Sequence, residues 1–194
     1  ARANVYHKEK NYKESAKNLT LANNLQLNIK LSKPDILFKK SELLLIESDK
    51  IEINLNNNIN CPKSIFIVGM PRSGSTLIES ILSMNPNVIA LGESNILEES
   101  IQRNRKAIQE STLAEEYWKQ VNHDTKLKII TNKWLYNYQY AGIIAKSIPQ
   151  AKIIHCFRNP LDNILSIYRT NFATSNEYSS SLIDCARIYL DQEE

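Results

Sequence analysis

The chain has 194 residues, of which 42% are hydrophobic and 23% charged, a composition typical of a soluble globular protein with one sizeable core. Lys and Arg total 24 against 21 Asp and Glu, and the net charge of +3 is spread along the chain, which argues against a nucleic-acid-binding protein. The apolar runs are only a few residues long, far below the roughly 20 residues that span a bilayer, so no membrane span is expected.

The cysteines do not indicate a cross-linked or metal-binding protein. Cys61, Cys156 and Cys185 are widely spaced and show no C-x-x-C pattern. This spacing predicts neither a disulfide framework nor a zinc site, and we expect reduced thiols packed in a cytoplasmic protein. Because Ala1 is not an initiator methionine, the lack of a signal peptide in this sequence does not establish the location.

The first element is expected to be helical. Residues 4–27 place apolar side chains at helical spacing, with a break near Lys10, and predict a helix, a short turn and a second helix. The order of Tyr12, Ala16 and Leu19 is similar to that of a tetratricopeptide repeat, a unit that needs neighbours to bury its faces. An ordinary helical hairpin is the alternative.

The sequence predicts two domains, separated by a polar stretch. After Pro34, residues 35–48 predict another amphipathic helix, and the polar residues 54–60 predict a boundary. We therefore expect a helical segment over residues 1–60, made of the last repeat and a linker helix, and a second domain over residues 61–194.

The second domain is expected to be of the α/β class. Short β-branched or aromatic runs alternate with segments of helical periodicity, which predicts a parallel sheet with helices on both faces. Ligands bind such sheets outside the carboxyl ends of the strands, so chemistry is expected directly after each run. The runs are residues 65–68, 88–91, 128–131 and 152–157.

A candidate anion site follows the first run. Gly69 and Gly74 have the spacing of a G-x-x-x-x-G-x-[ST] phosphate loop, in which backbone N–H groups and a helix N-terminus converge on an anion. Ser75 stands where a nucleoside triphosphatase carries its lysine, which disfavours ATP hydrolysis. The alternative is a glycine-turned junction without a ligand, although an arginine, three hydroxyls and two glycines in one turn are hard to explain by packing.

This loop carries a resemblance to a family. Residues 71–76 resemble the 5′-phosphosulfate loop of sulfotransferases that use 3′-phosphoadenosine 5′-phosphosulfate (PAPS), closest to the tyrosylprotein sulfotransferase-like branch found fused to tetratricopeptide repeats in bacteria. The resemblance implies a P-loop-like sulfotransferase fold, PAPS as co-substrate, PAP as product and no metal ion. It also implies that Arg72 faces the transferring group and that the 5′-phosphosulfate is held by Arg72, Ser73, Gly74, Ser75 and Thr76.

A second strand-to-helix junction offers another anion site. Arg158 stands at the carboxyl end of the fourth run, and Ser166 follows on the predicted helix, within possible reach of an anion held by the guanidinium. The stretch R-N-P-L-D continuing to Ser166 resembles the 3′-phosphate signature of the same family. Alone, it also fits a helix N-terminus with structural salt bridges. Arg169 follows Ser166 by three residues, which does not match the position of a further arginine in the family, and it is expected to be a solvated charge.

Glu93 is the candidate general base. It follows the second run and is expected at the carboxyl edge of the sheet, beside the phosphate loop. This position resembles that of the catalytic glutamate of the tyrosylprotein-like branch, which implies that Glu93 takes the acceptor proton. The alternative is a glutamate that caps the helix predicted over residues 95–108. The small-molecule branch uses a histidine, but His7, His123 and His155 do not follow a predicted strand at that position.

Lys133 is the candidate electrophile. It follows the third run in an Asn-Lys context, where the family places a catalytic lysine, and the resemblance implies that it neutralises charge on the leaving phosphate oxygen. A solvated lysine at a strand end is the alternative. For the aromatic cluster next to it, core packing or exposure on a helix face is expected for most members, with stacking on adenine or acceptor as the alternative. The cluster is Trp134, Tyr136, Tyr138 and Tyr140.

The expected function is sulfuryl transfer from PAPS to a hydroxyl of a protein tyrosine or of another alcohol or phenol, with Glu93, Lys133 and Arg72 as catalytic residues. Eukaryotic tyrosylprotein enzymes follow the glutamate with an acidic residue and an arginine, whereas this chain has Ser94 and Asn95, so the acceptor stays open. The expected partners are a protein or small-molecule acceptor and proteins bound through the repeat.

Two other functions stay open: a P-loop kinase or nucleoside triphosphatase, and a non-catalytic repeat-containing interaction protein with a vestigial nucleotide site. Family members usually continue past the point where this sequence stops, so the second domain is expected to be truncated at its C-terminus.

Overall fold

A computed structural model describes residues 2–52, 63–106, 112–121, 129–172 and 176–193 of the chain. The chain forms two compact units. The first comprises Ala1–Phe38 and Asn159–Glu194, and the second comprises Lys39–Arg158. The predicted boundary near residue 60 lies outside the described residues, and the division at that point stays a prediction.

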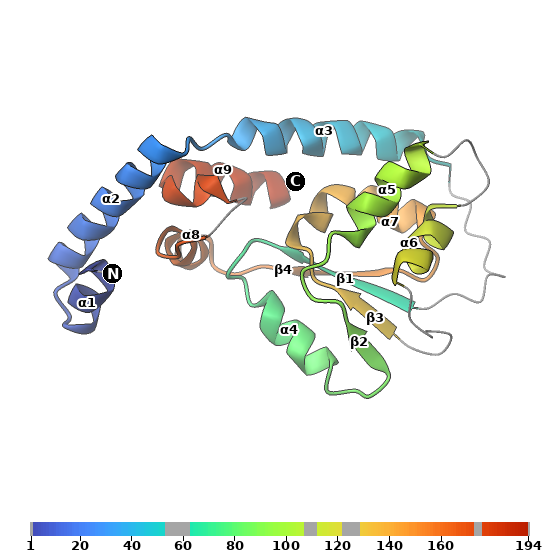
Figure 1. Cartoon of the computed structure of the whole chain (residues 1–194), viewed down its shortest axis with the longest axis horizontal. Helices are drawn as coiled ribbons and strands as arrows, with labels where there is room; N and C mark the ends of the chain where they lie inside the picture. Colours follow the sequence, from blue (N-terminus) through green and yellow to red (C-terminus); the bar gives the residue numbers. More distant parts are fainter. Residues whose placement is uncertain (1, 53–62, 107–111, 122–128, 173–175, 194) are drawn as a thin grey trace. The chain divides into compact units, whose positions relative to one another are not determined.

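The second unit is built on a parallel sheet of four strands in the order β2-β3-β1-β4. Each neighbouring pair is parallel, so the carboxyl ends of the strands meet at one edge, from which the loop to α4 departs (Figure 1). The four predicted strands are thus confirmed, except that Lys128 lies outside the described residues. The strands are β1 (Lys63–Gly69), β2 (Val88–Ala90), β3 (Ile129–Asn132) and β4 (Lys152–Cys156).

Helices flank this sheet, which confirms the predicted α/β class. Within the described residues, α5, α6 and α7 lie on one side of the sheet and α4 lies on the other (Figure 1). The C-terminal part of α3 (Pro34–Lys50) also belongs to this unit and packs Leu44 into its core. The other helical elements are α4 (Ser75–Leu82), α5 (Ile96–Lys106), α6 (Leu113–Val121), η1 (Leu135–Tyr140) and α7 (Ala141–Ser147).

The core follows from the two-residue period of the central strand. Phe66 and Val68 of β1 are buried in one apolar cluster with Ile130 of β3 and with side chains from the covering helices. The ring of Phe66 lies 5.5 Å from that of Tyr117, centroid to centroid. Full burial of these residues explains why β1 reads as a continuous apolar run, as expected for a central strand covered on both faces.

Helix α7 approaches α3 closely at Gly142. A Cβ built on Gly142 would lie 2.6 Å from Ser48 Oγ and 2.8 Å from Ser48 Cβ. The same contact is supported by Lys146 Nζ, which donates to the Ser48 carbonyl at 2.7 Å. A side chain at residue 142 therefore has no room unless the two helices move apart.

We expect Gly142→Ala to lower the free energy of unfolding by about 1–2 kcal/mol, because the overpacking cost exceeds the gain of roughly 1 kcal/mol in helix propensity. Urea unfolding followed by circular dichroism measures the change. Adding Ser48→Gly should recover part of the loss, since both close atoms belong to Ser48. A single variant as stable as the parent would show that the helices do not pack this closely.

The first unit consists of helices, and its N-terminal hairpin agrees with the predicted helix, turn and helix. Asn11 caps α2, its side chain accepting a hydrogen bond from the Glu14 N–H at 3.3 Å. Ser15 Oγ donates to the Ala3 carbonyl at 2.8 Å and holds α1 against α2. The elements are α1 (Arg2–Lys8), α2 (Tyr12–Ile29), the first residues of α3, α8 (Pro160–Tyr168), η2 (Glu177–Ser180) and α9 (Leu182–Glu193).

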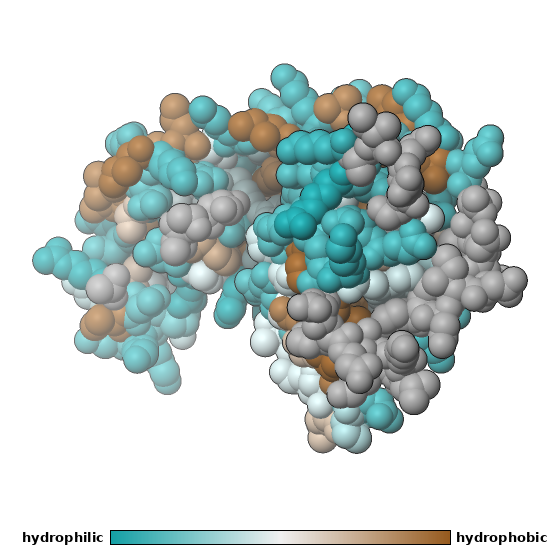
Figure 2. Space-filling model, turned by 45° about the vertical axis from the view of Figure 1, so that its right-hand side comes forward, coloured by the Kyte–Doolittle hydropathy of each residue, from teal (hydrophilic) through white to brown (hydrophobic). Residues whose placement is uncertain are grey.

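The surface of this hairpin carries apolar side chains. Leu21, Leu25 and Ile29 of α2 are exposed, and Figure 2 shows apolar residues among hydrophilic ones on the N-terminal helices. Such a surface suits a repeat that stacks on a neighbour, but assignment to the tetratricopeptide class stays a prediction. In the part of the chain that the structure describes, no helix combines the length and the apolar character needed to cross a membrane.

Two cysteines agree with the expectation of packed thiols. Cys156 and Cys185 are free and buried. Burial raises the pKa of the Cys156 thiol, and burial followed by the charge of Asp184 raises the pKa of Cys185 to about 12. Both residues therefore stay protonated near neutral pH. Cys61 lies outside the described residues.

Candidate functional site

The loop between β1 and α4 turns sharply through three residues with positive φ. Gly69 has φ 137°, Arg72 has φ 68° and Gly74, the N-cap of α4, has φ 104°. Leu77 N–H and Ile78 N–H both donate to the Gly74 carbonyl, so the helix begins directly after this glycine. Ser73 N–H donates to the Met70 carbonyl at 3.3 Å. The first N–H groups of a helix lack acceptors within the helix and, with the positive end of the helix dipole, favour an anion at this position.

The hydroxyl groups of this loop differ in their exposure to solvent. The Oγ of Ser73 is buried and has no hydrogen-bond partner among the described residues. Ser75 is also buried, whereas Arg72 and Thr76 are exposed. A buried hydroxyl without a partner is uncommon in proteins, and a ligand bound at this loop would supply one. The alternative of a turn without a ligand stays open.

Glu93 and Lys133 are in direct contact. Lys133 Nζ lies 2.7 Å from Glu93 Oε1, with 6% of the lysine side chain exposed against 63% of the glutamate side chain. The two residues follow neighbouring strands, β2 and β3, and Lys133 N–H donates to the Gly92 carbonyl at 2.8 Å. The alternative of a solvated lysine is wrong, because Lys133 is buried. Its ammonium group needs the Glu93 carboxylate, since an unpaired buried charge is costly.

The segment around Lys133 is fixed by a buried asparagine. Asn132 Oδ1 accepts a hydrogen bond from Trp134 N–H at 3.0 Å and from Asn137 Nδ2 at 3.1 Å. Of the aromatic cluster, Tyr140 is buried in the core as expected. The rings of Trp134 and Tyr136 lie 6.0 Å apart, centroid to centroid. The role of Asn132 was not evident from the sequence, because it depends on the turn that η1 makes after β3.

Glu79 is a second residue that sequence reasoning missed. It lies on α4 and is buried, although its neighbours Leu77 and Ile81 are exposed. Its Oε1 accepts hydrogen bonds from the Thr131 hydroxyl at 2.9 Å and from Gly92 N–H at 3.3 Å. The possible signal is its four-residue spacing from Ser75, which is also buried and places both polar residues on one helix face.

Arg158 and Ser166 belong to different units. Arg158 follows β4, which pairs directly with β1, and therefore stands at the same edge of the sheet as the phosphate loop. Ser166 lies on α8 of the first unit, so a joint anion site stays a prediction. The helix N-terminus predicted here is confirmed, because Asn159 Oδ1 accepts from Leu161 N–H and Asp162 N–H.

Two further features of the first unit concern residues near this helix. Arg169 is not the solvated charge that was expected, since its Nη1 lies 3.2 Å from Nδ1 of His7.

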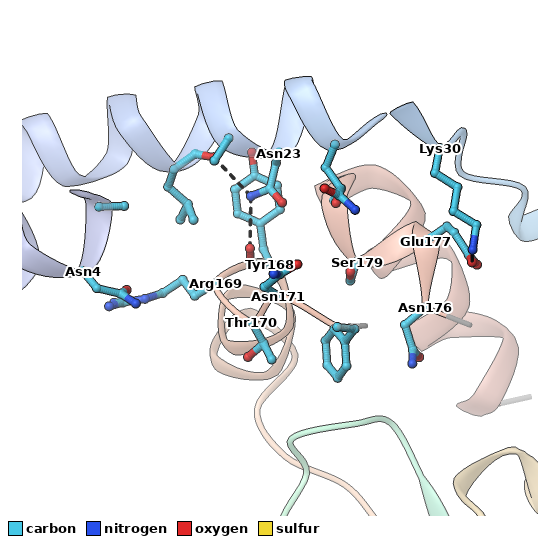
Figure 3. Close-up of a pocket in the computed structure, with 16 residues that line it drawn as sticks. Asn4, Asn23, Lys30, Tyr168, Arg169, Thr170, Asn171, Asn176, Glu177 and Ser179 are labelled. Carbon is cyan, nitrogen blue, oxygen red and sulfur yellow. Dashed lines mark hydrogen bonds and ion pairs between the residues drawn. The ribbon is translucent and has the colours of Figure 1, made fainter. Parts of the chain in front are cut away.

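A cavity of about 300 Å³ lies between α2 and the segment that follows α8 (Figure 3). Asn23 Nδ2 donates to the Tyr168 carbonyl at 3.1 Å at its wall, and Lys30 pairs with Glu177. None of the predicted site residues lines this cavity.

The sequence comparisons agree with this arrangement. The sequence model of the Sulfotransferase family matches residues 62–193, more than half of the chain, and the chain belongs to this family. An uncharacterized protein of Aquifex aeolicus (strain VF5) is 30% identical over 135 residues, which cover 59% of this chain and 18% of that protein. The chain therefore spans less than a fifth of the length of this relative.

Proposed function

We propose that this chain transfers the sulfuryl group of PAPS to a hydroxyl acceptor and releases PAP. The observation that carries the proposal is the contact between Glu93 and Lys133 at the carboxyl edge of the sheet. Lys133 follows β3, which lies next to the strand that leads into the phosphate loop, and Glu93 follows β2 on the other side of β3. A proton acceptor, a cation and an anion site at one edge are the groups that sulfuryl transfer requires.

Two anion sites would bind the donor. The loop residues Arg72, Ser73, Gly74, Ser75 and Thr76 would hold the 5′-phosphosulfate, and the unpartnered Ser73 hydroxyl supports this assignment. Arg158 would bind the 3′-phosphate, with Ser166 as its partner on α8. Because β1 and β4 are adjacent, the two sites start from neighbouring strands. This pattern suits a nucleotide with separate 5′ and 3′ phosphates better than a triphosphate.

The protein groups would divide the chemistry as follows. The Glu93 carboxylate removes the proton of the acceptor hydroxyl, whose oxygen forms the new bond to sulfur. As the bond between sulfur and the bridging oxygen breaks, the electron pair stays on the phosphate of PAP. Lys133 and Arg72 stabilise the negative charge on this leaving oxygen and on the transferring group. No step requires a metal ion.

The acceptor would be a protein tyrosine or another alcohol or phenol. Glu93 is largely exposed, so a bulky acceptor hydroxyl can reach it. The branch related to tyrosylprotein sulfotransferases, the preceding tetratricopeptide repeat and a cytoplasmic location are further parts of the proposal. The repeat would supply a surface for protein partners, and its exposed apolar residues on α2 support that role.

Calorimetric binding of PAP and of Mg-ATP to the parent chain and to Arg158→Ala tests the donor. We expect PAP to bind and Arg158→Ala to weaken it by about 10–100-fold, because a charged hydrogen bond contributes roughly 1.5–3 kcal/mol. Mg-ATP should bind weakly and respond little to the substitution.

Arg105→Ala is the matched control, since Arg105 pairs with Glu47 on the surface of the same unit and has no part in the proposal. It should leave PAP binding unchanged. Binding of Mg-ATP without PAP would favour a kinase or nucleoside triphosphatase, and binding of neither nucleotide would favour an interaction protein with a vestigial site.

A further inference from the structure

We propose that Glu79 is a positioning residue that holds the two strand ends carrying Glu93 and Lys133 in register. This inference rests on the proposed function, because it concerns the same pair of groups. Glu79 lies on α4, the helix that begins at the phosphate loop, and its carboxylate lies beside the ends of β2 and β3. It thereby joins three parts of the candidate site.

One carboxylate oxygen contacts both strand ends. Oε1 of Glu79 accepts a hydrogen bond from the Thr131 hydroxyl at 2.9 Å, two residues before Lys133. The same atom accepts from Gly92 N–H at 3.3 Å, directly before Glu93. Through these two hydrogen bonds, Glu79 restrains the backbone on each side of the Glu93–Lys133 contact.

Gly92 is the centre of this network. Its N–H donates to Glu79, and its carbonyl accepts from Lys133 N–H at 2.8 Å. Gly92 also adopts the left-handed conformation, with φ 64°. Glycine populates positive and negative φ about equally, so sterics alone do not fix this conformation. An external acceptor is therefore needed to fix the orientation of this residue, and with it the direction in which the chain continues to Glu93.

The burial of Glu79 is the reason to expect a specific role. The residue is 8% exposed, and placing a carboxylate there costs free energy that an apolar side chain would not. Thr131 is fully buried and supplies a donor that serves this carboxylate. Because a displacement of about 1 Å in a reacting group can cost roughly 100-fold in rate, a clamp at this position has a function that core packing alone does not explain.

The test uses Glu79→Met, which removes the acceptor, and Glu79→Gln, which keeps an amide oxygen able to accept from both donors. With PAPS and a phenol acceptor, we expect Glu79→Met to lower kcat by about 10–100-fold and to change KM for PAPS by less than about threefold. Glu79→Gln should stay within about threefold of the parent. Ser80→Ala is the control on the same helix, because Ser80 Oγ donates only to the Thr76 carbonyl in the described chain.

A second readout does not depend on turnover. Acetylation of lysines by a water-soluble amine reagent, quantified by mass spectrometry, should be slow at Lys133 in the parent and several-fold faster in Glu79→Met. The exposed Lys63 on the same sheet is the internal reference and should not change. A general loss of structure would raise the acetylation rates of many lysines at once, and Glu79→Gln would not restore the parent rates.

If Glu79→Met does not fold, Thr131→Val replaces it, since this variant removes one donor to Glu79 at nearly constant shape. A smaller loss of kcat, about 3–10-fold, is then expected together with faster acetylation of Lys133. The two readouts must move together. Unchanged kcat, or a loss of kcat with unchanged Lys133 reactivity, overturns the proposal for Glu79 and leaves the proposed function standing. The parent chain could instead fail to transfer a sulfuryl group while Glu79→Met still speeds the acetylation of Lys133. That outcome would refute the proposed function and support the positioning role of Glu79.

Discussion

Glu93→Gln is expected to lower kcat for sulfuryl transfer by about 10²–10⁴-fold, the usual contribution of a general base. Glutamine keeps the size of the side chain and can still accept a hydrogen bond from Lys133 Nζ, which lies 2.7 Å from the glutamate oxygen. It cannot take the proton of the acceptor hydroxyl. PAP affinity should stay within about threefold of the parent, because Glu93 contacts the acceptor side of the reaction in the proposed mechanism.

The measurement is initial rates with PAPS and a phenol acceptor, together with calorimetric binding of PAP. Glu99→Gln serves as the matched control, since it removes a carboxylate from the first turn of α5 that has no part in the proposal. Turnover of Glu93→Gln equal to that of the parent would refute the assignment of the base. A large loss of PAP affinity would instead assign Glu93 to donor binding.

Gly69→Ala is expected to destabilise the second unit by about 2–5 kcal/mol and to abolish PAP binding to the folded remainder. A Cβ at this residue would lie 2.3 Å from the carbonyl oxygen of Cys156 on β4, a backbone atom that cannot turn away. The residue also has φ 137°, which an alanine adopts only with strain. Because β1 pairs with β4 at this point, relief of the clash would separate the two strands that lead to the proposed anion sites.

Thermal unfolding followed by circular dichroism measures the loss, and Gly74→Ala is the matched control. Gly74 also has positive φ, at 104°, but nothing lies within 4 Å of a Cβ built there. Its substitution should cost only the backbone strain, about 1–2 kcal/mol. Equal losses for the two variants would show that the close approach of Gly69 to β4 contributes nothing.

The sheet could be predicted from the sequence because each strand is short, apolar and followed by a helical pattern. The β1 run is buried on both faces, and this is the case in which periodicity gives a continuous apolar stretch. The turn after β1 was also predictable, since two glycines five residues apart mark the positive φ values found at Gly69 and Gly74. These features depend on neighbouring residues and so can be read locally.

The contacts of the candidate site could not be predicted in the same way. The pairing of Glu93 with Lys133 joins residues 40 positions apart. Their places after predicted strands and the resemblance to a family indicated each residue, but not the contact between them. Helix α4 contradicts the usual rule, because Leu77 and Ile81 are exposed while Glu79 is buried. Hydrophobic patterning therefore selects the wrong face of this helix, and the carboxylate that contacts β2 and β3 is visible only in the folded structure.

The contact between Glu93 and Lys133 also sets an order of events in the proposed reaction. While the donor site is empty, the Glu93 carboxylate is occupied by its contact with the Lys133 ammonium group, 2.7 Å away. A bound donor would offer phosphate oxygens that compete for the same ammonium group. Once Lys133 turns to the donor, the Glu93 carboxylate would be free to accept a hydrogen bond from the acceptor hydroxyl. The proposed reaction would then follow a fixed order, with the donor bound before the acceptor.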